Sequence, residues 1–212
     1  MRDFPVFTTE YGVASLILKE IPYREIAYIL IRSSEQPEEL LAECVSFCRI
    51  CGAEKIYAAG HEFLQRYPLH SIVYEMRGEP PVEEALVENL WPVTPETVGQ
   101  WREIYNRRMR AVDNAATLEA ADEKRITESG GAYFVHAKGQ LLGIGWLEEG
   151  ELKAVASEIP GAGARVMHTL MSLIPGRQLQ LQVVSTNYRA IRLYEKLGFI
   201  KTAEVSRWYR VL

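Results

Sequence analysis

The chain of 212 residues carries 24 Lys and Arg against 28 Asp and Glu, for a formal net charge of −4. This acidic balance excludes the basic field that drives sequence-independent nucleic-acid binding, so we expect no nucleic-acid partner. Hydrophobic residues make up 48% of the chain, an ordinary share for a globular fold, and no window reaches the roughly 18 apolar residues of a membrane span. We therefore expect a folded cytoplasmic protein with no membrane partner.

The first 78 residues predict a small α/β unit. Two apolar segments, Val13 to Leu18 and Ala27 to Ile31, flank the turn signal at Ile21-Pro22 and predict a β-hairpin. Pro37 then opens a segment in which apolar residues recur at helical spacing up to Gly52. A strand, a short helix and another strand are expected next, over 54–59, 61–67 and 71–76.

The three cysteines of the chain lie in the predicted helix. Cys44, Cys48 and Cys51 fall on a largely apolar helical stripe, and no fourth ligand is close to them in the sequence. Their odd number also argues against a disulfide framework. We therefore expect buried structural thiols and no metal.

Residues 79–95 predict a connector to a second domain, which covers residues 96–212. Pro80, Pro81, Pro92 and Pro95 interrupt any helix in the connector. Two amphipathic helices open the second domain, and a three-stranded antiparallel meander follows them. The predicted meander strands are 132–137, 140–147 and 151–156, and they are followed by a helix at 164–173, a strand at 179–184, a helix at 187–197 and a final strand.

The segment from Asn187 to Phe199 carries the most informative motif. It reads Asn-Tyr-Arg-Ala-Ile-Arg-Leu-Tyr-Glu-Lys-Leu-Gly-Phe and follows a predicted strand. With these residues at this spacing and this order of elements, the second domain resembles the GNAT superfamily of N-acetyltransferases. The resemblance implies an α/β (α+β) fold with a mixed sheet, which is the GNAT-like acyl-CoA N-acyltransferase fold. It also implies acetyl-CoA as co-substrate. The first 78 residues resemble a degenerate GNAT-like unit, which would make the chain a tandem with an incomplete N-terminal copy.

The resemblance also places a pyrophosphate loop between a strand and a helix. In this sequence the loop corresponds to Gly161, Ala162, Gly163, Ala164 and Arg165. Glycines and unpaired amides at a helix N-terminus would hold the phosphates of acetyl-CoA there. The family usually has glutamine or arginine three residues before the first glycine. This chain has Glu158, whose carboxylate would repel phosphate if it pointed inward.

The helix that starts at Asn187 would supply further cofactor contacts. Asn187 has two readings, a helix cap or a hydrogen-bond partner of the pantetheine arm, and both stay open. Ala190 would allow the arm to approach closely. Tyr194 matches the general acid of the family, which gives a proton to the departing thiolate, although core packing is an alternative role.

The strand at 151–156 would form the other side of the cleft. The resemblance implies that an N–H near Val155 polarises the thioester carbonyl. An alkylamine acceptor has a pKa near 10, so it needs a base or a water chain. Three glutamates near the meander turn are candidates, and Glu151 is the first choice over Glu148 and Glu149.

The expected reaction is the direct attack of a primary amine on bound acetyl-CoA, without a covalent enzyme intermediate. The amine would belong to a small molecule or a protein that the sequence does not identify. A noncatalytic module that binds acyl-CoA or another protein through a degenerate GNAT fold is the alternative function. The sequence also leaves a homodimer open.

Overall fold

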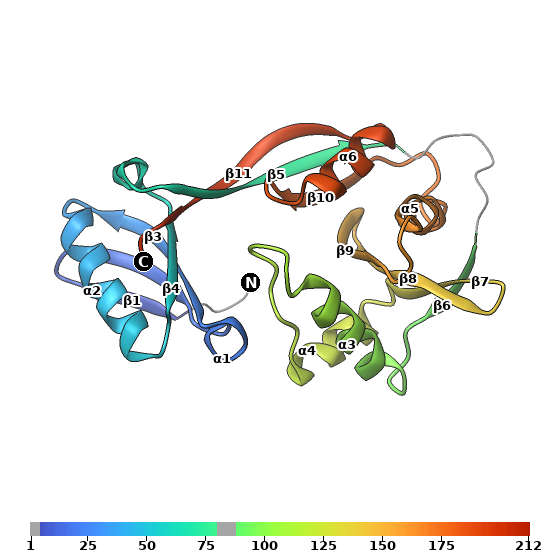
Figure 1. Cartoon of the computed structure of the whole chain (residues 1–212), viewed down its shortest axis with the longest axis horizontal. Coiled ribbons are helices and arrows are strands. Elements are labelled where there is room, and N and C mark those ends of the chain that lie inside the picture. Colours follow the sequence, from blue (N-terminus) through green and yellow to red (C-terminus); the bar gives the residue numbers. More distant parts are fainter. Residues whose placement is uncertain (1–4, 80–87) are drawn as a thin grey trace. The chain divides into compact units, whose positions relative to one another are not determined.

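The computed structural model describes residues 5–79 and 88–212 of the chain. These residues form two compact units (Figure 1). The first unit contains the chain up to Val73 together with Val205–Leu212, and the second contains Tyr74–Glu204. The predicted limits at residues 78 and 96 differ from this division, because two long strands contribute residues to both units. These strands are β5 (Leu69–Gly78) and β11 (Ile200–Arg210).

The first unit is a sheet covered by one long helix. Its strands lie in the order β1-β2-β3-β4-β11. The strand bounds are β1 (Val6–Thr9), β2 (Gly12–Ile17), β3 (Ile26–Ser34) and β4 (Lys55–Ala59). The helices are α1 (Ile21–Arg24), α2 (Pro37–Ile50) and the 3-10 helix η1 (Glu62–Arg66).

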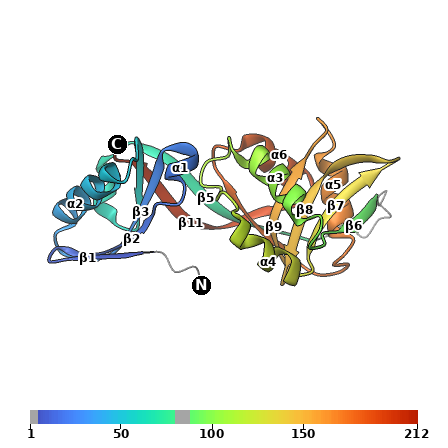
Figure 2. The same cartoon turned by 90° about the horizontal axis from the view of Figure 1, so that it is seen from below.

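The core of the first unit lies between α2 and the sheet. The predicted hairpin is confirmed, since β2 and β3 pair antiparallel, but its turn is the short helix α1. Helix α2 packs on β2 and β3 (Figure 2), and buries Leu40, Cys44 and Cys48 against them. Burial raises the pKa of Cys44 to about 11 and that of Cys48 to about 12, so both thiols stay protonated near pH 7. Cys51 is exposed.

The described residues of the second unit form the predicted meander and four helices. Its strands lie in the order β11-β5-β10-β9-β8-β7-β6. The strand bounds are β6 (Asn89–Pro92), β7 (Ala132–Ala137), β8 (Gln140–Glu148), β9 (Glu151–Ser157) and β10 (Leu179–Val184). The helices are α3 (Val98–Met109), α4 (Ala120–Glu128), α5 (Gly163–Met171) and α6 (Tyr188–Lys196).

Helices cover both faces of the sheet in the second unit (Figure 1). Residues of α5 and α6 share one buried cluster with Leu152 and Phe199. Residues of α3 and α4 share another with Trp146 and Ala154. The polypeptide therefore places a separate hydrophobic layer on each side of β8 and β9, as expected for a sheet buried on both faces.

Strand β6 lies inside the predicted connector and was not expected from the sequence. It pairs antiparallel with β7, and Pro92 is its last residue. β6 is the edge strand of the sheet order, where the missing N–H of a proline removes no ladder hydrogen bond. Pro92 is thus compatible with a strand. Pro80 and Pro81 lie outside the described residues.

The two halves of the chain exchange their last strands. In the first unit, the end of β11 pairs antiparallel with β4, at Tyr209 with Ala58 and Arg210 with Tyr57. In the second unit, β5 is the neighbour of β10. Each unit is therefore completed by a strand from the other half of the sequence.

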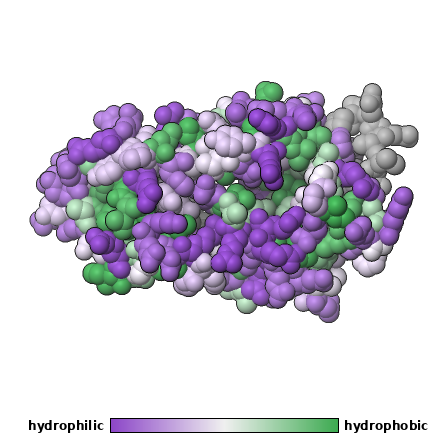
Figure 3. All heavy atoms as spheres, viewed as in Figure 1, coloured by the Kyte–Doolittle hydropathy of each residue, from purple (hydrophilic) through white to green (hydrophobic). Residues whose placement is uncertain are grey.

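The surface is mostly polar in the view of Figure 3, where hydrophobic side chains form separate patches. Among the described helices, none is both long and apolar enough to cross a membrane.

Candidate functional site

Strands β9 and β10 separate along their length. They pair in parallel only at Glu151 with Gln180 and at Leu152 with Leu181. Both strands continue beyond these pairs, β9 to Ser157 and β10 to Val184, but no further residues of the two strands are paired. The sheet is therefore closed at the start of these strands and open at their carboxyl ends.

A β-bulge distorts β9 just after the closed end. Trp146 of β8 lies opposite Ala154, whereas the next residue, Leu147, lies opposite Leu152. Lys153 is the extra residue of the bulge. Because of this insertion, Leu152 and Ala154 face opposite hydrophobic layers although they are two positions apart.

The backbone of Val155 points toward the opening. The amide of Glu158 donates to the carbonyl of Leu142, which makes these two residues a hydrogen-bonded pair at the end of the β8–β9 ladder. Hydrogen-bonded and non-hydrogen-bonded pairs alternate in an antiparallel ladder. The pair of Val155 with Gly145 is therefore of the non-hydrogen-bonded kind, and the Val155 N–H and C=O point away from β8. They lie on the edge of β9 that β10 has left.

The loop from β9 to α5 follows the open end of β9. Gly161 has φ of 83°, a left-handed conformation that favours glycine, and Ala162 is the N-cap of α5. The amide of Val166 donates to the carbonyl of Ala162, which begins the helical ladder. The three preceding amides, those of Gly163, Ala164 and Arg165, are the unsatisfied donors of the first turn. They form a suitable surface for an anion.

Gly163 also allows α5 to approach α6. A Cβ at this position would lie 3.0 Å from Cδ2 of Leu193. The first turn of α5 therefore lies against the second turn of α6. The guanidinium of Arg165 is paired with Glu88, to which its Nε donates at 2.8 Å.

Asn187 caps α6. Its Oδ1 accepts a hydrogen bond from the amide of Ala190 at 3.2 Å, which is the capping role considered in the sequence. Beside it, Thr186 donates to a carboxylate oxygen of Asp113 at 2.7 Å. The segment after α3 is thus fixed to the open end of β10.

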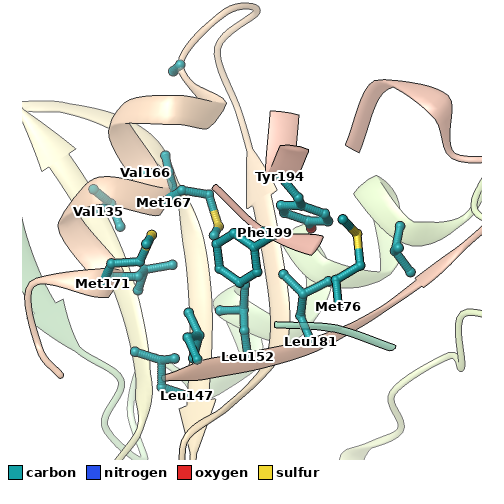
Figure 4. Close-up of a cluster of buried hydrophobic side chains, with 14 of the residues drawn as sticks. Met76, Val135, Leu147, Leu152, Val166, Met167, Met171, Leu181, Tyr194 and Phe199 are labelled. Atoms are coloured by element: carbon teal, nitrogen blue, oxygen red, sulfur yellow. The ribbon is translucent and has the colours of Figure 1, made fainter. Parts of the chain in front are cut away.

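Tyr194 lies inside the hydrophobic cluster on the α5 side of the sheet. Its ring is 5.9 Å from that of Phe199, centroid to centroid, and Figure 4 shows Tyr194 close to Phe199 and Met76. Burial raises the pKa of Tyr194 to about 12, so the phenol is fully protonated at neutral pH. The hydroxyl makes no hydrogen bond to the described residues.

Glu151 lies at the closed end of the two strands. Its carboxylate forms an ion pair with Lys153, and the four residue steps from Glu151 to Val155 span about 13 Å of strand. Glu148 and Glu149 border a cavity of about 520 Å³ at the same end. The structure therefore groups the three candidate bases together, away from the Val155 amide.

Two arginines near the loop were not expected from the sequence. Arg107 and Arg108, in the last turn of α3, both contact Glu158. At a helix end, such residues look like an ordinary solvated surface, and the contact from Arg107 spans 51 positions of sequence.

Among the described residues, no group of three or more His, Cys, Asp or Glu side chains is placed to hold a metal ion.

Several solved structures with a similar fold carry acetyltransferase names, and others are proteins of unknown function. A comparison with protein-family models finds no match, and neither does a comparison with curated proteins. Among solved structures, an acetyltransferase of the GNAT family from Colwellia psychrerythraea is 15% identical, with a TM-score of 0.52, and the match covers 97% of this chain and 83% of that one. A GCN5-related N-acetyltransferase from Sphaerobacter thermophilus is 10% identical, with a TM-score of 0.55 and 93% and 75% of the two chains covered.

A third similar structure is a tandem protein. It is a tandem GNAT protein from the clavulanic acid biosynthesis pathway, 15% identical to this chain, with a TM-score of 0.53 and 94% and 78% of the two chains covered. At these identities the likeness concerns the fold. The chain has the GNAT fold, a mixed α/β structure, and both were expected from the Asn187 motif and the order of elements.

Proposed function

We propose that the chain is an N-acetyltransferase that binds acetyl-CoA between β9 and β10. The observation that carries the proposal is the separation of these strands after two paired positions, beside the first turns of two helices. An unpaired strand edge offers N–H and C=O groups to an extended chain with amides, such as pantetheine. The helix N-terminus at Gly163 offers amides to a pyrophosphate.

Each group in the opening has a role in the proposed reaction. The N–H of Val155 donates to the thioester carbonyl and holds the oxyanion that develops during attack. The acceptor nitrogen forms a C–N bond to the acetyl carbon as the C–S bond breaks. The amine proton passes to water or to a carboxylate, and the coenzyme A sulfur leaves as a thiolate. Asn187 keeps its cap and directs the start of α6 toward the opening.

The burial of Tyr194 determines how it could assist the leaving group. A phenol with a pKa of about 12 is a weaker acid than a thiol, whose ordinary pKa is near 8.5. Complete proton transfer to the thiolate is therefore uphill, whereas hydrogen-bond donation to it remains favourable. We assign Tyr194 to that donation, with protonation of the thiolate completed by solvent.

The position of Glu151 at the closed end gives little support to a direct role as base. It could act only through a chain of water molecules that crosses the roughly 13 Å to Val155. The acceptor, a primary amine of a small molecule or a protein, is not defined by the residues of the opening.

The test of the proposed function is a calorimetric titration of the protein with acetyl-CoA. A Gly161→Glu, Gly163→Glu variant places two carboxylates against the phosphates and should abolish binding. Gly161→Glu alone adds a carboxylate without the packing change at Gly163 and should still weaken binding; Gly176→Glu is its matched control, since Gly176 also has a positive φ, of 66°, and open space around it. The proposal fails if the folded wild-type protein does not bind acetyl-CoA.

A second function, acyl-CoA binding without transfer, is supported by the burial of Tyr194. A side chain fixed in a hydrophobic cluster serves packing as well as catalysis. Transfer of acetyl groups to a panel of primary amines distinguishes the two functions, because a binding module would release acetyl-CoA unchanged.

A further inference from the structure

Three charged side chains meet where β9 enters the loop to α5. An Nη2 of Arg107 lies 2.6 Å from Oε2 of Glu158, and Nε of Arg108 lies 3.3 Å from its Oε1. Arg108 also donates to the carbonyl of Ser157. The Glu158 side chain is 22% exposed, whereas those of Arg107 and Arg108 are 59% and 36% exposed. The Glu158 carboxylate is thus more shielded from solvent than the two guanidinium groups.

The charge of this cluster is positive. Two guanidinium groups against one carboxylate leave a net charge of +1 beside the loop. A guanidinium has five N–H donors, and the contacts with Glu158 and Ser157 use only part of them. Glu158, which the sequence suggested would repel phosphate, is therefore compensated and instead holds two cations close to the loop.

The cluster lies within reach of the anion surface of α5. Gly161 is the third residue after Glu158, so the Cα atoms of these two residues are at most about 10 Å apart. By contrast, Arg165 in the first turn of α5 is paired one to one with Glu88, which leaves no net charge there.

We propose that Arg107 and Arg108 are the side-chain ligands for the phosphate groups of the acyl-CoA, and that Glu158 is their positioning residue. The inference rests on the proposed function and adds a contact from α3 to the site. Guanidinium groups bind phosphate oxygens with charge-assisted, often bidentate hydrogen bonds. Glu158 fixes the two long side chains before the ligand arrives, which reduces the conformational entropy lost on binding.

The test compares acetyl-CoA binding by four proteins, measured by calorimetry at low and at high NaCl concentration. They are the wild type, Arg107→Gln with Arg108→Gln, the same pair combined with Glu158→Gln, and the control Arg110→Gln. Arg110 is the next arginine along the chain, is exposed, and forms no ion pair with the described residues. The triple variant removes all three charges, so it leaves no uncompensated carboxylate that would impair folding.

We expect both arginine variants to bind acetyl-CoA about tenfold or more weakly than the wild type at low salt, since each loses charge-assisted hydrogen bonds. The loss should be larger in the double variant, where Glu158 keeps its negative charge. The difference in acetyl-CoA affinity between each arginine variant and the wild type should be smaller at high salt, because salt screens the attraction between the arginines and the phosphate groups. Arg110→Gln should bind as the wild type does.

Two results would overturn the inference while leaving the proposed function intact. One is wild-type affinity in the triple variant. The other is a loss of affinity that is the same at both salt concentrations, which would indicate a purely structural role for the cluster. If the wild type itself does not bind acetyl-CoA, it is the proposed function that fails.

Discussion

Gly145 of β8 lies directly under α5, and a single added methyl group tests how closely that helix is held. A Cβ at Gly145 would lie 2.2 Å from Cδ1 and 2.5 Å from Cδ2 of Leu170, which is fully buried. No rotamer change inside a packed core relieves such contacts without cost, so Leu170 or the whole of α5 must move. Overpacking of this kind costs about 1–3 kcal/mol. We expect Gly145→Ala to destabilise the second unit by that amount.

The compensating variant makes the reasoning specific. Leu170→Ala alone should cost about 2–5 kcal/mol, because it leaves a cavity in the core. When Gly145→Ala and Leu170→Ala are combined, the methyl group added on β8 occupies part of the space that the leucine side chain has vacated. The double variant should therefore be at least about 1 kcal/mol more stable than the sum of the single effects predicts.

The free energy of unfolding can be measured by urea denaturation with tryptophan fluorescence. Trp101 and Trp146 are buried together in the second unit, with ring centroids 6.2 Å apart, and report its unfolding. A neutral Gly145→Ala, or single effects that add within about 0.5 kcal/mol, would refute the close packing of α5 on β8. Since α5 carries the proposed phosphate surface, Gly145→Ala should also weaken acetyl-CoA binding, and the double variant should partly restore it.

Three further predictions concern the buried hydroxyl and thiol groups. Tyr194→Phe should lower kcat by about tenfold or more and change the acetyl-CoA affinity by less than about twofold, because only a transition-state hydrogen bond is lost; an unchanged kcat removes Tyr194 from the mechanism. The folded pKa of Tyr194, about 12, exceeds the ordinary value of 10, so its contribution to stability is complete below pH 10 and is lost as pH rises toward 12. Between about pH 9 and about pH 11, the free energy of unfolding measured with urea should therefore fall less for Tyr194→Phe than for the wild type. Equal losses would contradict the burial of the hydroxyl. A thiol reagent should modify Cys51 in the native protein and reach Cys44 and Cys48 only after urea unfolding, as judged by mass spectrometry.

The parts of the fold that the sequence predicts well are those determined by local patterns. The helix after Asn187 and the loop at Gly161 are short segments in which a cap, a glycine or an apolar period specifies the local structure. The meander was predicted for the same reason, since Lys138-Gly139 and Glu149-Gly150 mark its turns.

The contacts that shape the candidate site depend on residues far apart in the chain. Arg107 reaches Glu158 across 51 positions, and Asp113 reaches Thr186 across 73. Neither pairing has a local signal, because a charged residue at a helix end or in a loop is compatible with many partners. The exchange of β5 and β11 between the units is equally hidden, since a strand's sequence specifies its buried face but not its neighbour.

The first half repeats the order of the second from β7 to β10, but its strands are paired differently. In both halves three antiparallel strands lead into a helix and then a parallel strand: β1, β2, β3, α2 and β4 correspond in order to β7, β8, β9, α5 and β10. Strands β3 and β4, however, pair at five successive positions, from Ile26 with Lys55 to Leu30 with Ala59, whereas β9 and β10 pair at two. Strand β4 is therefore paired with β3 along its whole length, whereas most of β10 has no partner in β9.

The helix that follows β3 is also unsuited to a phosphate. Pro37 at its first position has no N–H to donate, and Glu38 and Glu39 place negative charge in its first turn. Both features stabilise a helix N-terminus internally, through the fixed φ of proline and the interaction of carboxylates with the helix dipole. In α5 the first turn has no acidic residue, and its amides remain available. The first half thus has the strand order of β7 to β10 without the available amides of α5, and its helix begins instead with groups that stabilise the helix itself.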